Sequence, residues 1–358
     1  MPDLHSIESA LAPLLWNKAR IKLLAAVVVA LLSAQSINLM KLALLMPTSA
    51  KVPSAYKRLQ RFLADFAPDM DTFARLLSSL CKIAPPWNLA IDRTNWKLGA
   101  AHLNLLMLCM VCEHISFPLL WVPLSKEGKG KAGNSNTAER SALMQRFVRL
   151  FGASACQCLR ADREFASRDW LKCLEDNGIS YQLRIKSDIL VADSQGELCC
   201  ANWLFKDCPV QQERVLGFRK VLGKVRFVTG TRLADGDFLI VVSDVERPLC
   251  EYSLRWGIET MFGAFKRRGL NLEDTHVTAP ERLCRLMMFL TLAYTWAGVC
   301  GLWEVGDPEF KWVIKTHGRH AVSVFRIGID YLRPIMLRLC RNVNESQAAN
   351  ARRFLSCT

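Results

Sequence analysis

Residues 87–124 read WNLAIDRTNWKLGAAHLNLLMLCMVCEHISFPLLWVPL and contain three runs that are typical of β-strands. The three runs are Trp87–Asp92, Ala101–Ile115 and Phe117–Leu124. The second run is long and continuous, which is typical of a strand buried on both faces of its sheet. The Pro-Pro pair at 85–86 separates these runs from the preceding segment, because proline stops a helix. The stretch therefore predicts the beginning of a buried sheet.

Helices and further strands alternate after this stretch. A loop rich in glycine and lysine, SKEGKGKAGNSN, leads into a predicted helix over Thr137–Leu150, with Ser135 or Asn136 as its cap. The elements expected next are a strand over Ala155–Arg160, a helix over Arg168–Asp176 and a strand over Tyr181–Lys186. The order β-β-β-α-β-α-β predicts a mixed α/β layered fold.

The flanking segments follow other patterns. Residues 1–84 read as helical, since apolar residues recur at spacings of three and four. Residues 187–246 hold short alternating runs separated by Gly and Asp, as expected of an inserted β-rich segment. Helices are expected again at 250–268 and 280–302. The pattern divides the chain into parts at 1–84, 85–186, 187–246, 247–302 and a basic C-terminal region at 303–358.

The composition indicates a globular protein with an anionic partner. The 358 residues include 47 Lys and Arg against 33 Asp and Glu, a formal net charge of +14. Hydrophobic residues make up 51%, which suffices for a sizeable core and excludes disorder as the main state. The charge favours nucleic acid or an anionic membrane surface as partner. The 14 Cys lack zinc-ligand spacing and lie in apolar runs, which indicates reduced thiols in a cytoplasm.

Two apolar segments are candidates for membrane spans. Leu23–Leu32 has ten residues, whereas a spanning helix needs roughly 20. Leu283–Leu302 is longer, but Arg285 and two glycines interrupt it, so a buried core helix is expected. The sequence therefore predicts no membrane association.

The segment YSLRWGIETMFGAFK, residues 252–266, combines charged and apolar positions at helical spacing. At 100° per residue, Tyr252, Arg255, Glu259 and Lys266 fall within about 60° of arc. A separate apolar stripe comprises Leu254, Ile258, Met261, Phe262 and Phe265. One stripe is expected to pack on a core, while the other presents a carboxylate among basic groups and a phenol. The alternative is an ordinary amphipathic helix with a salt-bridged, exposed face.

Two aspartates follow strand-like runs upstream of this helix. Asp92 ends WNLAID and precedes RTNWK, and Asp162 follows ACQCLRA and begins DREF. Either Asp alone is commonly a turn or cap residue. Carboxylates that gather in space but lie far apart in sequence also suit Mg²⁺, which prefers hard oxygen ligands. Glu164 and Asp169 are weaker candidates for the position of Asp162.

The spacing Y-x2-R-x3-E-x6-K over residues 252–266 resembles the signature of the IS4 family of bacterial insertion-sequence transposases. The contexts of Asp92 and Asp162 resemble the first and second Asp motifs of that family. The segments GNSNTAERSALMQRF and KTHGRHAVSVFRIGID are also similar, so the resemblance covers roughly residues 54–335.

The resemblance implies a fold and a catalytic centre. The expected fold is a ribonuclease-H-like mixed sheet with the β-rich insertion at 187–246, preceded by a helical DNA-binding domain at 1–84. The catalytic domain would comprise 85–186 and 247–302. The implied centre binds two Mg²⁺ ions, for which Mn²⁺ is expected to substitute, and clamps the attacking and leaving oxygens of a phosphodiester. Its catalytic and metal-binding residues would be Asp92, Asp162 and Glu259.

The resemblance also implies DNA contacts. Tyr252, Arg255 and Lys266 would contact the DNA strand near the cleaved phosphate, since Arg and Lys neutralise phosphate and a phenol can donate to it. On the insertion, a run without acidic residues predicts a stripe that contacts the DNA backbone. This stripe comprises Arg219, Lys220, Lys224, Arg226 and Arg232.

Two further groups of residues stay open at this stage. In the IS4 family an aromatic of the insertion accepts a flipped base, and the candidates here are Trp203, Phe227 and Phe238, each of which also suits a core position. The loop lysines 126, 129 and 131 suit either a phosphate contact or a solvated loop.

The function implied is cut-and-paste DNA transposition in the bacterial cytoplasm, near the nucleoid. A homodimer would pair two terminal inverted repeats of double-stranded DNA and cut with activated water. The freed 3′-hydroxyl would then form a hairpin end and later attack target DNA. The alternatives are a ribonuclease-H-like nuclease that does not join ends, and a catalytically inactive DNA-binding regulator of transposition. The presence of all three carboxylates argues against the inactive regulator.

Overall fold

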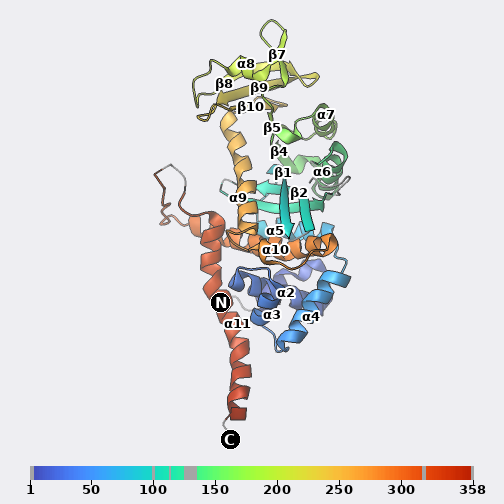
Figure 1. The fold of residues 1–358 in the computed structure, drawn as a ribbon, viewed down its shortest axis with the longest axis vertical. Helices are drawn as coiled ribbons and strands as arrows, with labels where there is room; N and C mark the ends of the chain where they lie inside the picture. The colour runs from blue at the N-terminus through green and yellow to red at the C-terminus, as the bar shows by residue number, and fades with distance from the viewer. Residues whose placement is uncertain (1–3, 99–100, 113, 125–134, 317–319, 356–358) are drawn as a thin grey trace. The chain divides into compact units, whose positions relative to one another are not determined.

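The computed structural model describes the chain except for residues 1–3, 99–100, 113, 125–134, 317–319 and 356–358. The chain forms two compact units, which we call the helical unit and the sheet unit. The helical unit comprises residues 1–82, 95–103 and 260–358, and the sheet unit comprises 83–94 and 104–259. Each unit is described here by itself (Figure 1).

Helices from both ends of the chain build the helical unit. Its longer helices are α1 (Leu4–Ala10), α2 (Lys18–Ala34), α3 (Leu39–Leu45), α4 (Val52–Asp65), α5 (Met70–Cys81), α10 (Pro280–Val305) and α11 (Val324–Leu355). The helical reading of residues 1–84 is thus confirmed. The N-terminal helices share one unit with α10 and α11, because α2 packs against both of them. The domain limits at 84 and 302 stay predictions.

The apolar segments of the helical unit form its core. Every residue of α2 from Leu23 to Ser33 is buried. By length and composition α10 could cross a membrane, and α2 with α3 would add a second span if the two were one, although they meet at 103°. In the most apolar window of α10, 72% is buried against other elements, mainly α2, α4, α5 and α11. This packing is that of a core helix.

The C-terminal region is more regular than the mixed segment expected from the sequence. After an irregular stretch, the 32-residue helix α11 begins at Val324 and packs along α10. Its buried residues keep helical spacing, and Pro334 is exposed. A proline there removes one backbone hydrogen bond but no core contact.

A single ten-stranded sheet forms the sheet unit, in the order β3-β2-β1-β4-β5-β10-β9-β8-β6-β7. The first five strands are β1 (Trp87–Leu98), β2 (Ala101–Val111), β3 (Ser116–Pro123), β4 (Cys156–Ala161) and β5 (Tyr181–Ile185). β1 pairs with β4 and β4 with β5 in parallel, whereas β2 and β3 are antiparallel. This part of the sheet has the strand order of a ribonuclease-H-like fold, as predicted.

Two helices lie on one side of these strands (Figure 1). They are α6 (Thr137–Phe151) and α7 (Arg168–Asp176), both close to their predicted limits. Of the two predicted caps of α6, the structure uses Asn136, which forms a capping box with Glu139. Ser135 instead accepts a hydrogen bond from Arg140.

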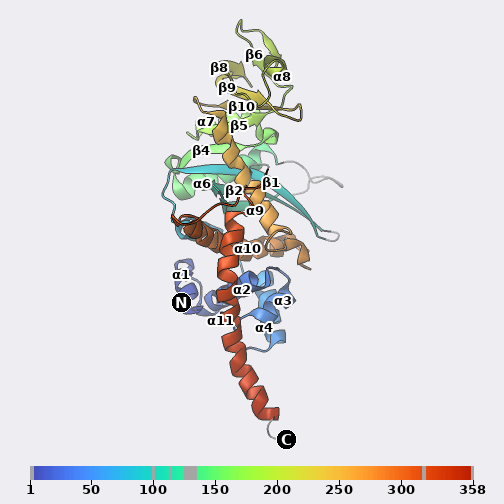
Figure 2. The ribbon, with the colours of Figure 1, turned by 90° about the vertical axis from the view of Figure 1, so that its left-hand side faces the viewer.

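The insertion continues the same sheet. Its elements are β6 (Leu190–Ala192), β7 (Leu198–Cys200), α8 (Ala201–Phe205), β8 (Arg214–Val221), β9 (Lys224–Arg232) and β10 (Phe238–Ser243). β10 returns antiparallel to β5, so the insertion adds strands at that edge of the sheet. α8 lies beside these strands in both views (Figures 1 and 2).

Candidate active site

Asp92 and Asp162 lie side by side on neighbouring parallel strands. In the pairing of β1 with β4, Ile91 is opposite Ala161, so the two aspartates occupy the next position on each strand. Asp162 directly follows the end of β4, whereas β1 continues past Asp92 to Leu98, so this strand is longer than the predicted run. The structure therefore brings together two of the three predicted catalytic carboxylates.

Burial makes the carboxyl of Asp92 unusual. It is nearly enclosed, and this burial raises its pKa from the ordinary 3.8 to about 7, although the guanidinium of Arg255 acts in the opposite direction. The backbone N–H of Arg93 donates to its Oδ1 at 2.7 Å. Because burial disfavours the charged form of this carboxyl, a cation that binds Asp92 near neutral pH has to displace its proton.

The third predicted carboxylate, Glu259, lies on a helix and is linked to Asp92 through Arg255. Residues 250–268 do not form one α-helix as predicted, because η4 (Leu249–Arg255) is a 3₁₀ helix and α9 (Trp256–Phe265) begins after it. Glu259 lies in the first turn of α9 and receives a hydrogen bond of 2.7 Å from Arg255. The other terminal nitrogen of Arg255 lies 3.3 Å from Asp92. One guanidinium thus joins Asp92 to Glu259.

Tyr252 and Arg255 share a face of η4, since residues three apart eclipse in a 3₁₀ helix. The guanidinium lies 5.7 Å from the centroid of the Tyr252 ring. The sequence predicted that this face presents its groups outward, but Tyr252 is only 3% exposed and Arg255 only 5%. The hydroxyl of Tyr252 donates to the carbonyl of Ala161, directly before Asp162. Tyr252 therefore ties η4 to the strand end that carries the second aspartate.

The acidic groups around Arg255 keep it charged. Burial acts to lower its pKa, but the surrounding acidic side chains outweigh this and raise the pKa above its ordinary value. Its Nε has no hydrogen-bond partner in the described part of the chain. Arg255 serves in this arrangement as the counter-cation of the carboxylates.

A glycine lets α9 approach the sheet. A Cβ at Gly257 would collide with the hydroxyl of Ser116 at the start of β3. Ile258 is fully buried beside this contact, as the predicted apolar stripe requires. The close approach fixes the turn of α9 on which Glu259 lies.

The other two acidic candidates, Glu164 and Asp169, are respectively paired with an arginine and exposed. Glu164 accepts two hydrogen bonds from Arg93, at 3.2 and 3.3 Å. Asp169 is exposed in the first turn of α7. The structure thus favours Asp162 over both as the second carboxylate.

The carboxylates suit a divalent cation. Oδ1 of Asp162 is buried and lacks a hydrogen-bond partner among the described residues. A buried carboxylate oxygen without a donor is an unmet demand for positive charge, and hard carboxylate oxygens are the ligands that Mg²⁺ prefers. Within the described residues, no three His, Cys, Asp or Glu side chains are close enough to share a metal in the present arrangement. In this arrangement the guanidinium of Arg255 contacts both Asp92 and Glu259, in the place that a cation shared by the two carboxylates would take.

A buried arginine fixes the start of η4. Arg160 on β4 is 1% exposed and donates to Asn88 at 2.7 Å, to Gln182 at 3.1 Å and to Glu251 at 2.8 Å. Gln182 in turn donates to the carbonyl of Pro248, the residue before η4. No local sequence pattern could predict this network, because its members come from four separate elements.

Strand alternation divides the basic run on the insertion between two faces. In the antiparallel β8–β9 pair, Arg219 lies opposite Arg226 and Lys220 opposite Val225. Arg226 is 2% exposed and holds Glu175, so its burial takes it out of the predicted DNA-contact stripe. Lys224 also pairs with Glu175. Charge alone suggested one surface, whereas side chains on neighbouring strand positions point to opposite faces.

The remaining predicted DNA contacts lie apart from this centre. Lys266 follows α9 in the helical unit, where its ammonium lies 5.6 Å from the centroid of the Trp96 ring. Lysines 126, 129 and 131 fall outside the described residues. Of the three aromatic candidates, Phe227 is buried and Phe238 is half-buried, while Trp203 is exposed beneath the ammonium of Lys206.

An exposed tryptophan beside the site was missed by the sequence reasoning. Trp256 is 57% exposed and directly follows Arg255. It borders a hollow of about 280 Å³ on the sheet unit. The hollow is lined by Gln211, Glu213, Thr231, Leu239, Leu249, Cys250, Tyr252, Ser253 and Trp256. The signal was present, since Trp256 belongs to neither stripe of the 252–266 helical wheel.

Residues 84–296, more than half of the chain, match the family model described as the transposase DDE domain. The match includes Asp92 within β1, Asp162 directly after β4 and Glu259 on α9. The chain belongs to this family of transposase DDE domains. Proteins of the family generally use divalent metal ions, which agrees with the carboxylate set described above.

A solved structure with some similarity is the cryo-EM structure of the piggyBac transposase synaptic complex with hairpin DNA. The two chains share 11% identity with a TM-score of 0.43, and the match covers 81% of this chain. The match covers 60% of the length of that transposase. Comparison with curated proteins found no match.

Proposed function

We propose that this protein is a DNA transposase of the IS4 type, which cuts its element at terminal inverted repeats and joins the freed ends to target DNA. The observation that carries the proposal is that Asp92, Asp162 and Glu259 all surround the guanidinium of Arg255, with the two aspartates at neighbouring positions of the paired β1 and β4. The family match supports the transposase class. The Y-R-E-K spacing supports the IS4 assignment.

The three carboxylates would hold the divalent cations, with Mg²⁺ as the expected ion and Mn²⁺ as a substitute. When bound, these cations supply the positive charge that phosphoryl transfer needs at the attacking and leaving oxygens. Asp92 contributes a carboxyl that burial keeps partly protonated near neutral pH, so cation binding releases its proton. Asp162 contributes the unpartnered Oδ1.

Arg255 and Tyr252 prepare the site for the DNA strand. The guanidinium neutralises Asp92 and Glu259 while no cation is present. Once those carboxylates are neutralised in another way, the same guanidinium is free to donate to a phosphate, as the resemblance implies. Tyr252 keeps η4 against the strand end through its bond to Ala161. In this proposal Arg255 pairs first with the carboxylates and afterwards with a phosphate.

The partners and location follow from the same proposal. The substrates are double-stranded terminal repeats and target DNA, and a homodimer pairs two ends in the bacterial cytoplasm. The net charge of +14 supports a polyanionic partner. Of the predicted stripe, Arg219, Lys220 and Lys224 remain candidates for backbone contacts, and Lys266 remains a candidate in the helical unit.

The test is cleavage of linear DNA that carries the sequences flanking the gene. The wild type should cut at the element boundary in Mg²⁺, whereas Glu259→Gln should bind the same DNA and fail to cut. The matched control is Glu246→Gln, an exposed glutamate of the same unit. Ca²⁺ should support binding without cutting.

The products decide between the alternatives. Hairpin or joined ends identify a transposase, and simple hydrolysis identifies a nuclease. Binding without cleavage by the wild type in Mg²⁺ or Mn²⁺ identifies an inactive regulator. If Glu259→Gln cuts at the wild-type rate, the assignment of the third carboxylate is wrong.

A further inference from the structure

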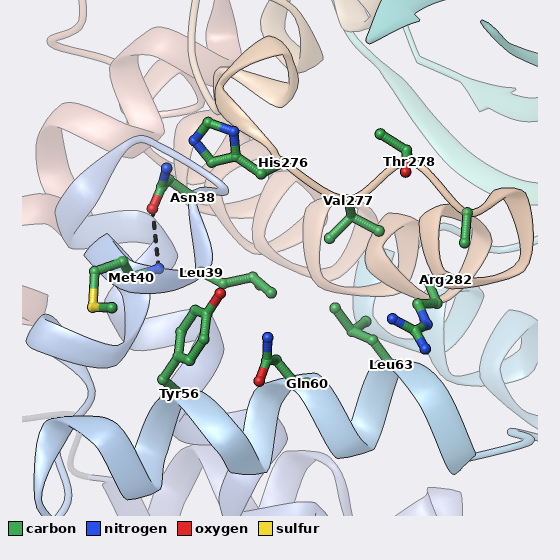
Figure 3. A pocket seen from close by; sticks show the side chains of 11 residues that line it. Asn38, Leu39, Met40, Tyr56, Gln60, Leu63, His276, Val277, Thr278 and Arg282 are labelled. Carbon is green, nitrogen blue, oxygen red and sulfur yellow. Dashed lines mark hydrogen bonds between the residues drawn. The ribbon is translucent and has the colours of Figure 1, made fainter. Parts of the chain in front are cut away.

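A polar cleft in the helical unit has no part in the site described above. Its volume is about 300 Å³, and it lies between α4 and the segment that leads into α10 (Figure 3). Tyr56, Gln60 and Leu63 line one side along α4, and Val277 and Arg282 lie on the other (Figure 3). The remaining lining residues are Asn38, Leu39, Met40, His276, Thr278 and Ala279.

The cleft offers hydrogen-bond donors and no acid. None of its described lining residues is Asp or Glu. No hydrogen bond or ion pair within the described chain engages the side chains of Tyr56, Gln60 or Arg282. The nearby carboxylate of Asp274 is already held by Lys41 at 2.7 Å and by Ser36 at 2.5 Å. The lining therefore matches an anion with several acceptor oxygens.

The surface beside the cleft is basic. Lys57, Arg58 and Arg61 follow the same helix as Tyr56 and Gln60, and none forms an ion pair in the described part of the chain. A row of free cations beside a cleft of donors suits a polyanion better than a single small anion.

We propose that this cleft binds a backbone phosphate of duplex DNA, with Arg282 and Gln60 donating to its oxygens and the cations of α4 contacting neighbouring phosphates. The proposal rests on the proposed function, which makes DNA the polyanion at hand. A phosphate contact carries no sequence information, so the cleft would serve end and target DNA alike.

The test is the affinity of the full chain for a duplex of arbitrary sequence, measured by fluorescence anisotropy over a range of salt. Arg282→Ala should weaken binding several-fold and lower the slope of log affinity against log salt by about 0.9, the effect of one lost phosphate contact. Gln60→Glu should weaken binding further, because it places a carboxylate in the cleft. Gln145→Glu on α6 is the control, since it changes the net charge equally at an exposed site outside the cleft.

Four results would decide the matter. Equal losses in Gln60→Glu and Gln145→Glu would overturn the proposal, because only net charge would then matter. Unchanged affinity and slope in Arg282→Ala would also overturn it. A wild type that binds no duplex would instead remove the proposed function, whereas normal cleavage with unaffected cleft variants would remove the cleft alone.

The Arg160 network carries a second, independent inference. Two hydrogen bonds hold the start of η4: Arg160 donates to Glu251, and Gln182 donates to the carbonyl of Pro248. The same η4 ends at Arg255, which contacts the carboxylates. We infer that Arg160 is a positioning residue, which acts through Glu251 to set the angle at which η4 and α9 deliver their side chains. This inference also rests on the proposed function.

Its test compares two substitutions of the half-exposed Glu251, which spare the buried arginine. Glu251→Ala should lower the cleavage rate at saturating DNA and metal by roughly ten- to a hundredfold, with DNA affinity unchanged. Glu251→Gln keeps an acceptor for Arg160 and should restore most of the rate. Hydrogen exchange over residues 249–259 should speed up only in Glu251→Ala.

Equal rates and equal exchange in the two variants would refute the positioning role of Arg160. The exchange measurement needs no cleavage. Its result therefore stands even if the protein proves not to be a transposase.

Discussion

Replacing Asp92 with asparagine should stabilise the metal-free protein while abolishing catalysis. The carboxyl of Asp92 is nearly enclosed, and burial raises its pKa from 3.8 to about 7 in spite of the nearby Arg255. The folded state therefore binds this proton more tightly than the unfolded state does. Stability consequently falls as the pH rises from about 4 to about 7, because the folded protein must then ionise a buried group.

The size of the effect follows from the two pKa values. The pKa of Asp92 differs by about three between the folded and the unfolded state, which corresponds to about 4 kcal/mol of unfolding free energy. The wild type has this stabilisation at low pH, where the carboxyl is protonated, and has lost it above about pH 7. Asparagine cannot ionise, so Asp92→Asn should exceed the wild type by about 4 kcal/mol at pH 8 and by little at pH 4. The amide oxygen of asparagine can still accept from Arg255, which limits any opposing loss.

Urea unfolding in EDTA at pH 4, 6 and 8 measures this difference. Asp188→Asn, at an exposed turn of the same unit, is the matched control and should show no pH-dependent gain. Mg²⁺ at pH 8 should stabilise the wild type and leave Asp92→Asn unchanged, since a ligand stabilises only the state that binds it. A variant that is less stable at pH 8, or a gain that is equal at every pH, would refute the reasoning.

Two further predictions concern the packing that supports the site. Glu175→Ala removes the partner of the buried Arg226 and should lower the free energy of unfolding by about 3 kcal/mol. The control Asp176→Ala, at an exposed site, should lower it only a little. Equal losses of the two variants in urea unfolding would contradict this prediction. Gly257→Ala should destabilise the protein by about 1–3 kcal/mol through its collision with the Ser116 hydroxyl, and adding Ser116→Ala should recover most of the loss. A double-mutant cycle of Gly257→Ala and Ser116→Ala measures that recovery as a departure from additivity. Strictly additive effects would show that the strain does not arise from this contact.

Local patterns predicted most of the sheet unit. The apolar runs after residue 86 and the alternation of β8, β9 and β10 identified these strands, since side-chain period is a local property. The pairing of β10 with β5 could not be predicted in this way, because it joins segments more than 50 residues apart. The three-residue strand β7 and the short helix α8 are too short to impose a period on the sequence.

The predicted site was clearest where one helix or strand decided the geometry. Helical spacing placed Arg255 and Glu259 on one face, and the structure joins them by an ion pair, as in the alternative interpretation of a salt-bridged helix face. The burial of Tyr252 was not predicted, because helical angles give the direction of a side chain relative to its neighbours and not what lies beyond it. Arg226 is a similar case: strand pairing places it on the same face as Arg219, and its burial comes from contact with Glu175 on α7, a distant segment that no local pattern identifies.

The contacts of Arg255 reconcile the sequence and the structure. The sequence resemblance makes Arg255 a phosphate ligand, whereas the structure gives both of its terminal nitrogens to Asp92 and Glu259. The same N–H groups cannot donate to carboxylates and to a phosphate at once. We propose that the two descriptions belong to two states, in which the carboxylates are neutralised first by the arginine and then by bound cations. In such a scheme cation binding and phosphate binding are coupled, because each releases the group that the other requires.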